Sequence, residues 1–267
     1  MNPIRYFYSV NGCDKKALKM RPRYFYVSNG MKTLSVICAR AGSKGLPNKC
    51  ITKIAGKMVI EYSIEYSLSL GENVRTVVST DIRGVIDYCK ANGIDCIDRD
   101  PSLCMDTTRI DCVLADAIEK KGRDSNYCSL VYGNIPVRYP AIFRDAITFL
   151  RGHPDYDAVM SMQEAGKFHP AWMFDYNTEI LPKTKGGHYR RQMLSQKMFH
   201  DGHTVVFKSG EFLKRYKGLI PYAKSRHSIF GAKIKPLINT ELIVDIDTER
   251  DLKVAAAAIS RGSTEGL

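Results

Sequence analysis

The sequence predicts an α/β fold built on a doubly wound, mostly parallel sheet. Two observations carry this prediction. Short apolar runs recur from residue 33 onward, and stretches with helical spacing of apolar residues separate them. The first run, TLSVIC at residues 33–38, lacks the alternation of a half-solvated strand and is typical of a strand buried on both faces. Strands that alternate with helices in this way form a parallel sheet with helices on both sides.

Each later element follows from the same patterns. The expected strands lie at 33–38, 75–79, 94–97, 127–132, 158–162, 203–208 and 242–246. The expected helices lie at 60–70, 85–92, 108–121, 140–151 and 249–260. Gly133 and Pro136 end the fourth strand, and Thr107 or Thr108 can cap the third helix. Ligands of such sheets bind at the carboxyl ends of the strands, so we expect the site to follow Cys38 and the ends of the other central strands.

Length and composition are those of a globular protein. The chain has 267 residues, of which 44% are hydrophobic and 25% charged, and this excludes wholesale disorder. No apolar run approaches the roughly 20 residues of a membrane helix, and we see no secretory signal, so we expect no membrane span and a cytoplasmic protein. The eight cysteines form no C-x-x-C pair and have no histidine at zinc-finger spacing, so we expect reduced thiols.

The first 30 residues differ from the rest. They hold six basic residues and one acidic residue, and the near-repeat RYFY at 5–8 and 23–26. We interpret 1–30 as a basic, aromatic-containing appendage of the kind that is often disordered, 31–262 as one domain, and 263–267 as a tail. A solvated appendage is favoured over one that contacts nucleic acid or a membrane. The net charge of +12 favours anionic partners, but no nucleic-acid-binding motif is present, so nucleic acid is not the expected partner.

The loop after the first strand carries the strongest chemical signal. Residues 39–49, ARAGSKGLPNK, hold two glycines, a serine and three cations. Glycines let a ligand approach the backbone, exposed N–H groups bind anions, and Arg and Lys neutralise phosphates. The loop is neither a P-loop nor G-x-G-x-x-G. Its place after a buried strand favours phosphate binding over an ordinary strand–helix turn.

Two aspartates near the last expected strand form a second candidate site. Asp245 and Asp247 stand at i and i+2, which on a strand places both carboxylates on one face. Such carboxylates repel each other unless a cation lies between them, and Mg²⁺ prefers these oxygens together with substrate phosphates and water. The alternatives are that both are solvated, or that Asp247 or Thr248 caps the helix that follows.

Taken together, these segments resemble the CMP-sialic acid synthetases (acylneuraminate cytidylyltransferases) of the nucleotide-sugar cytidylyltransferase superfamily. The loop is similar to the family's nucleotide-binding signature. Further matches follow in order at V-S-T-D 78–81, R-D-P-S-L 99–103, D-T 106–107, R-Q 191–192 and D-I-D-T 245–248, followed by D-L 251–252. The resemblance spans about residues 33–260. It implies a Rossmann-like nucleotide-diphospho-sugar transferase fold, with residues 160–205 as a protruding segment for substrate binding and dimerisation, and hence a homodimer.

The resemblance also implies a reaction and a set of residues. CTP and an acidic 2-keto sugar would give a CMP-sugar and pyrophosphate, with Mg²⁺, as the anomeric hydroxyl attacks the α-phosphate. The implied catalytic residues are Arg40, Lys49 and Asp247, and the implied metal ligands are Asp245 and Asp247. The implied nucleotide-binding residues are Ala39, Arg40, Gly42, Ser43, Lys49, Arg99 and Asn134. The implied sugar-binding residues are Asp81, His169, Arg191 and Gln192, of which Asp81 could instead cap a helix and His169 could be structural.

Three positions depart from the family pattern. Cys50 and Tyr132 stand where nucleotide recognition is expected, and His200 where acceptor recognition is expected. The G-N-I-P stretch at 133–136 resembles the related CMP-Kdo synthetases. Two alternatives therefore stay open: a cytidylyltransferase for another acidic acceptor such as a Kdo-like sugar, and a nucleotide-binding member of the fold without turnover.

Overall fold

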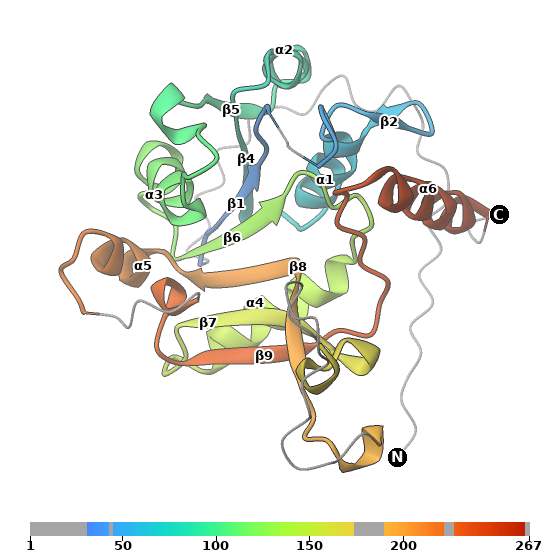
Figure 1. Ribbon diagram of the computed structural model, residues 1–267. Coiled ribbons are helices and arrows are strands. Elements are labelled where there is room, and N and C mark those ends of the chain that lie inside the picture. Colours follow the sequence, from blue (N-terminus) through green and yellow to red (C-terminus); the bar gives the residue numbers. More distant parts are fainter. Residues whose placement is uncertain (1–30, 43–44, 174–189, 222–226, 265–267) are drawn as a thin grey trace.

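The computed structural model describes residues 31–42, 45–173, 190–221 and 227–264, drawn as coloured ribbon in Figure 1. The strands are β1 (Thr33–Cys38), β2 (Lys53–Ile54), β3 (Lys57–Met58), β4 (Val74–Thr80), β5 (Asp95–Asp98), β6 (Tyr127–Tyr132), β7 (Ala158–Glu164), β8 (Met198–Lys208) and β9 (Ile234–Ile238). The helices are α1 (Val59–Leu68), α2 (Arg83–Ala91), α3 (Ile110–Lys121), α4 (Pro140–Gly152), α5 (Ser209–Tyr216) and α6 (Glu249–Thr264).

The main sheet has seven strands in the order β5-β4-β1-β6-β8-β7-β9. β1 pairs in parallel with β4 and with β6, and Cys38 lies opposite both Ser79 and Tyr132. β8 runs antiparallel to its neighbours β6 and β7, whereas β7 and β9 are parallel. The predicted fold class, a mostly parallel sheet with helices, is confirmed. The shared register means that β1, β4 and β6 end at one edge of the sheet.

Helices cover both faces of the sheet. α3 and α5 pack on one face around Leu34, Leu130 and Phe207, and α1 and α4 pack on the other around Ile37 and Val206. In α3 the buried residues Val113, Leu114, Ala117 and Ile118 recur at helical spacing, which is why this stretch forms an amphipathic helix. The short β2–β3 hairpin and α6 lie side by side, so the end of the chain returns to the region that follows β1 (Figure 1).

Most expected elements are present, with three corrections. Residues 242–246 are irregular rather than a strand: Val244 and Ile246 are buried, but the Ile246 N–H pairs with the carbonyl of Asn134 instead of a strand ladder. The buried side chains of this stretch pack instead into the cluster that α1 and α6 share. The N-cap of α3 is Arg109, not Thr107 or Thr108, and the N-cap of α2 is Ile82, not Asp81.

Other expectations concern the whole chain. The hairpin, α5 and β9 were not expected, and the appendage at 1–30 lies outside the described residues, as do residues 265–267 at the end of the chain. Seven cysteines are described and all are free, while Cys13 lies outside the description. Among the described helices none is long and apolar enough to cross a membrane.

A buried histidine joins β8 to the segment after β6. His203 is fully buried, and its Nε2 accepts a hydrogen bond from the Tyr139 N–H at 2.8 Å. Its Nδ1 lies 2.7 Å from the Thr204 hydroxyl, so the ring is neutral with the proton on Nδ1. Burial, and secondly the charge of Arg138, lower the pKa of His203 from 6.5 to about 3.

This histidine should make stability depend on pH. Unfolding takes up a proton on His203 between pH 6.5 and about 3, so its contribution to stability is complete above pH 6.5 and is lost as the pH falls. The free energy of unfolding falls by at most about 1.4 kcal/mol per pH unit from this group. Denaturant titrations at several pH values between 6.5 and 5 give the free energy of unfolding. We expect this free energy to depend less steeply on pH in His203→Gln than in the wild type. Equal slopes would contradict this account.

Candidate functional site

A cleft lies at the carboxyl ends of β1, β4 and β6. Its volume is about 320 Å³. Its lining includes Ala39, Arg40, Gly45, Lys49, Cys50, Arg99, Tyr132, Asn134 and Asp247, with Leu103, Met105, Thr108, Ile110 and Val113 on the apolar side. Most nucleotide-binding residues expected from the sequence, which lie between Ala39 and Asn134, therefore meet in one place, and Asp247 joins them from near the end of the chain. Ser43 lies outside the described residues.

Backbone contacts fix the loop after β1. The Ala39 N–H donates to the carbonyl of Ser79 at 3.1 Å, and the Ala41 N–H donates to the Asp81 carboxylate at 2.8 Å. Gly42 has φ +72°, a left-handed conformation that favours glycine. Asp81 therefore shapes this loop, a contact that the sequence did not predict.

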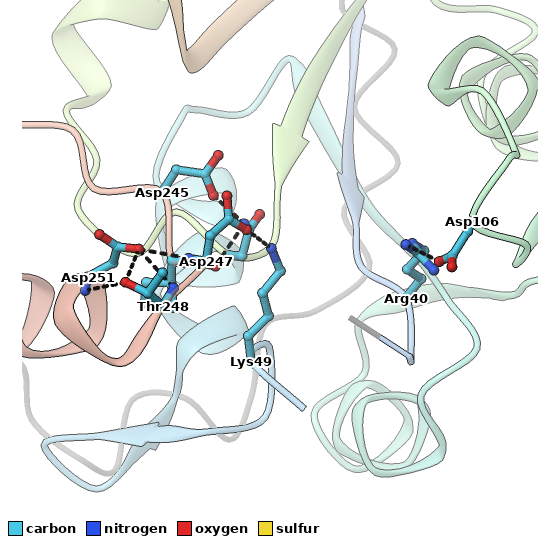
Figure 2. A network of polar contacts seen from close by, with 9 residues as sticks. Arg40, Lys49, Asp106, Asp245, Asp247, Thr248 and Asp251 are labelled. Carbon is cyan, nitrogen blue, oxygen red and sulfur yellow. Dashed lines mark hydrogen bonds and ion pairs between the residues drawn. The ribbon is translucent and has the colours of Figure 1, made fainter. Parts of the chain in front are cut away.

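Two arginines lie on one side of the cleft. The Arg40 guanidinium forms an ion pair with Asp106 at 2.6 Å. Arg99 is 6% exposed and donates to the Ser79 carbonyl at 2.6 Å and to the Ser79 hydroxyl at 3.2 Å. Figure 2 shows Arg40 and Asp106 on one side of the view and Lys49 with Asp247 on the other. An anion in the cleft would thus meet positive charge from both sides.

Lys49 bridges to the far end of the chain. Its Nζ lies 2.6 Å from Oδ1 of Asp247 (Figure 2). The backbone makes a second contact here, since a Cβ on Gly45 would lie 2.6 Å from the Asp247 carbonyl oxygen. Glycine is thus required for the loop to approach the 245–247 segment this closely.

The helix α6 is capped without the side chain of Asp247. The Asp251 carboxylate accepts from the Thr248 N–H and hydroxyl, both at 2.8 Å, and the Asp251 N–H donates to the Thr248 hydroxyl at 3.3 Å. This reciprocal pair is a capping box, as Figure 2 shows. Of the two capping residues expected, Thr248 is the cap, so the side chain of Asp247 points to Lys49 instead.

Asp245 lies beside Asp247 at the rim of the cleft. Its carboxylate accepts a hydrogen bond from the Asn134 amide, which also donates to the Ile246 carbonyl at 3.3 Å. Desolvation of the carboxyl group, and secondly the negative charge of Asp247, raise the pKa of Asp245 above its ordinary value of 3.8. The two aspartates are therefore close enough to repel each other, although the segment is not a strand.

These residues fit a magnesium ion that is shared with a substrate. Two carboxylates that repel each other are stabilised by a cation, and Mg²⁺ is usually held by one or two carboxylates plus phosphates and water. The described part of the chain holds no group of three or more acidic, histidine or cysteine side chains suited to a metal. The protein alone thus offers an incomplete ligand set at Asp245 and Asp247.

The comparisons with known proteins agree with this geometry. A sequence model of the family described as "Cytidylyltransferase" matches residues 34–250. The chain belongs to the cytidylyltransferase family. It is 28% identical over 228 residues to N-acylneuraminate cytidylyltransferase of Streptococcus agalactiae, a match that covers 83% of this chain but about half, 52%, of that protein. It is 24% identical to pseudaminic acid cytidylyltransferase of Campylobacter jejuni, covering 84% of this chain and 95% of that one.

Solved structures show the same fold. The structure of CMP:2-keto-3-deoxy-manno-octonic acid synthetase complexed with CTP superposes with a TM-score of 0.67 at 17% identity, covering 86% of this chain and 99% of that one. The 4-diphosphocytidyl-2C-methyl-D-erythritol synthase from Anaerococcus prevotii gives a TM-score of 0.59 at 14% identity, covering 86% and 99%.

The sugar-binding residues expected from the sequence do not line the cleft. His169 uses both ring nitrogens, since Nδ1 accepts from the Ala171 N–H at 3.1 Å and Nε2 lies 2.9 Å from the Ser195 carbonyl. Gln192 is exposed in the short helix η5 (Arg191–Met193), and the side chain of Arg191 lies outside the description. Their roles stay predictions.

A second hollow, of about 420 Å³, adjoins the cleft. Ile110 and Tyr132 line both. Its other lining residues are Arg109, Asp111, Leu130, His200, Val205, His227, Ile229 and Phe230. Arg109 holds the buried Asp111 at 2.7 Å, and the rings of His200 and His227 meet edge to face at 5.5 Å. In the sequence, Tyr132 and His200 stood out only as departures from the family pattern. Arg109 and His227 belong to no motif that the sequence analysis found.

The expected substrate and dimerisation segment, 160–205, is mixed in character. Met160 is fully buried in the core. Phe168 is 61% exposed, Met193 56% and Phe199 43%. Exposed apolar side chains of this kind are typical of interaction surfaces, so the expected homodimer stays a prediction with this face as its candidate.

Cys50 lies in the wall of the cleft and is 4% exposed. Burial raises the pKa of its thiol to about 11, in spite of the neighbouring Lys49. At neutral pH it is a small, uncharged part of the wall and not a nucleophile.

The contact between Gly45 and Asp247 should not tolerate a methyl group. Gly45→Ala places Cβ against a backbone carbonyl, and we expect a loss of about 1–3 kcal/mol in the free energy of unfolding together with weaker CTP binding. Denaturant titration and calorimetry measure both effects. Gly84→Ala is the matched control, because no atom lies within 4 Å of its Cβ position. Equal behaviour of the two variants would contradict the close approach.

Proposed function

We propose that this chain transfers the cytidylyl group of CTP to an acidic 2-keto sugar, giving a CMP-sugar and pyrophosphate. The observation that carries the proposal is the meeting of the cationic loop after β1 with the two-aspartate segment across one cleft, through Lys49 and Asp247 at 2.6 Å. Relatives named for N-acylneuraminate, pseudaminic acid and 3-deoxy-manno-octulosonate support this class of acceptor. A Kdo-like acceptor is the alternative within that class.

In this reaction the sugar hydroxyl oxygen forms a bond to the α-phosphorus, and the bond from that phosphorus to the bridging oxygen breaks. Negative charge grows on the phosphoryl oxygens and on pyrophosphate, so positioning and electrostatic stabilisation do most of the work. Arg40 and Lys49 face this charge from opposite sides of the cleft. The Asp247 carboxylate is placed to accept the proton of the hydroxyl once Lys49 turns to the phosphates.

A magnesium ion at Asp245 and Asp247 would shield the phosphates and polarise the attacking hydroxyl. The triphosphate competes with Asp247 for the Lys49 ammonium, which is 17% exposed in its side chain. Nucleotide binding would thus release the Asp247 carboxylate and complete the ligand set. Binding of the nucleotide and of the metal should therefore favour each other.

We place the acceptor in the second hollow, which adjoins the cleft at Tyr132 and Ile110. Arg109 offers a guanidinium for a carboxylate, and the apolar wall of Ile229 and Phe230 can pack against the carbon skeleton of a sugar. Since Asp111 already holds Arg109, an acid would share this guanidinium with it.

Pyrophosphate release tests the function directly. We expect release with CTP, rather than ATP, GTP or UTP, and with one acid among neuraminic, legionaminic, pseudaminic and Kdo-type sugars. Asp247→Asn should lower kcat about 100-fold or more, because the charge that assists the hydroxyl is lost. Asp124→Asn, which changes an exposed carboxylate paired with Lys32, is the matched control. Arg109→Met should raise KM for the acid about tenfold and leave KM for CTP unchanged.

The results of this assay distinguish an active transferase from a nucleotide-binding protein without turnover. Release with none of the acids while CTP still binds would favour a nucleotide-binding member without turnover. Failure to bind CTP would contradict the proposal itself.

Calorimetric titration of CTP tests the metal. Saturating Mg²⁺ should tighten CTP binding to the wild type about tenfold, ~1.4 kcal/mol. Asp247→Asn should lose this gain and Asp124→Asn should keep it. The same affinity with and without Mg²⁺ in the wild type would contradict a shared metal site.

A further inference from the structure

Arg138 holds three backbone carbonyls at once. It follows β6 by six residues, and its Nε donates to the Ile135 carbonyl at 2.9 Å. Its Nη1 donates to the His203 carbonyl at 2.6 Å, and its Nη2 donates to the Tyr132 carbonyl at 2.7 Å. No carboxylate of the described residues lies within ion-pair distance of this guanidinium. Arg138 therefore acts as a clamp between β8 and the turn that ends β6.

Burial of the charged Arg138 side chain costs free energy, because it removes the guanidinium from water. Desolvation lowers the pKa of Arg138 to about 10, so the guanidinium stays charged at neutral pH. The guanidinium also lies over the Tyr66 ring, 5.2 Å from its centroid. A desolvated charge without a carboxylate partner is destabilising compared with an apolar side chain of similar volume. The rigid fork of arginine donors is the feature that an apolar residue or a lysine cannot supply.

What the clamp holds is the turn at 132–135. The Ser63 hydroxyl reaches the carbonyls of Tyr132 and Ile135, both at 3.1 Å, from the other side. The Gly133 N–H donates to the Cys38 carbonyl at 2.9 Å, and a Cβ on Gly133 would lie 3.2 Å from that same oxygen. The turn is thus fixed against the end of β1 with little room to shift.

Asn134 projects from this turn to the acidic segment. Its amide donates to the carboxylate of Asp245 and to the Ile246 carbonyl at 3.3 Å, and its own carbonyl accepts from the Ile246 N–H at 3.0 Å. These contacts join the turn to the irregular segment that carries both aspartates. The position of Asp245 therefore depends on where the turn places Asn134.

We propose that Arg138 is a positioning residue of the site, which holds the turn at 132–135 so that Asn134 fixes Asp245 and the 245–247 segment at the cleft. The effect on catalysis rests on the proposed function, whereas the effect on the segment does not. Residues that orient the ligands of a metal typically contribute about 10- to 100-fold to metal affinity or activity.

A double-mutant cycle with Arg138→Lys and Asn134→Ala tests the proposal. Lysine keeps the charge but cannot hold three carbonyls in one plane. We expect each single variant to lower kcat and to raise the Mg²⁺ concentration for half-maximal activity about 10- to 100-fold. The double variant should be no worse than Asn134→Ala, because Arg138 acts through Asn134. Independent, additive losses would overturn the proposal.

Hydrogen exchange gives a readout that needs no activity. The Ile246 N–H bonds to the Asn134 carbonyl, so its exchange should become about tenfold faster in Arg138→Lys. Arg215→Lys is the matched control: Arg215 lies on α5, is 7% exposed and pairs at 3.0 Å with Asp157, which directly precedes β7. It should lower stability without changing exchange at Ile246 relative to the rest of the chain. Unchanged exchange at Ile246 in a folded Arg138→Lys would overturn the proposal, even if the chain proved to have no transferase activity.

Discussion

The site depends on the parallel register of β1 between β4 and β6. Cys38 lies level with Ser79 and with Tyr132, so three strands end at one edge and their loops share one space. Parallel strands place their carboxyl ends together, and backbone N–H groups of the following turns face the same side. These three strand ends position the cationic loop, the contacts between Ser79 and Arg99, and the turn at Asn134. A shift of one residue in this register would turn every inward side chain to the other face.

The last third of the chain completes the site from outside the sheet. The segment 245–247 forms no strand, and it is held by the buried Val244 and Ile246, by Asn134 and by Lys49. The capping box of Thr248 and Asp251 fixes the start of α6 directly after it. Because α6 packs on the β2–β3 hairpin, the loop after β1 and the acidic segment are anchored to the same small cluster. The opposite charges are therefore brought together by packing and not by their mutual attraction alone.

The cleft and the adjoining hollow are formed by partly different elements of the molecule. The fold is shared with enzymes that are named for quite different acceptors. Their low sequence identity to this chain supports similarity of fold only. Among the described residues, β1 and the loop after it line the cleft proposed for the nucleotide, and β8 and the short helix η6 (Ser228–Phe230) line the adjoining hollow. β6 and α3 contribute residues to both spaces. Under the proposed function, a different acceptor can be accommodated in the hollow without disturbing the strand ends. Tyr132 lines both spaces, so under the proposed function it lies where the nucleotide and the acceptor meet.

The sequence by itself determined the fold class and many of the residues that line the cleft. The runs at Thr33–Cys38 and Tyr127–Tyr132 have the predicted bounds, because continuous burial on both faces leaves an apolar run that turn residues end sharply. The cationic loop was visible because its residue types and its place after a strand are local features. Only the tertiary structure decided the antiparallel β8, the irregular 242–246 segment, and the contacts of Asp81 and Arg138 with distant backbone groups. The physical reason is that backbone carbonyls and N–H groups are the same at every residue, so the sequence shows which side chains can bind them but not which ones the fold brings within reach.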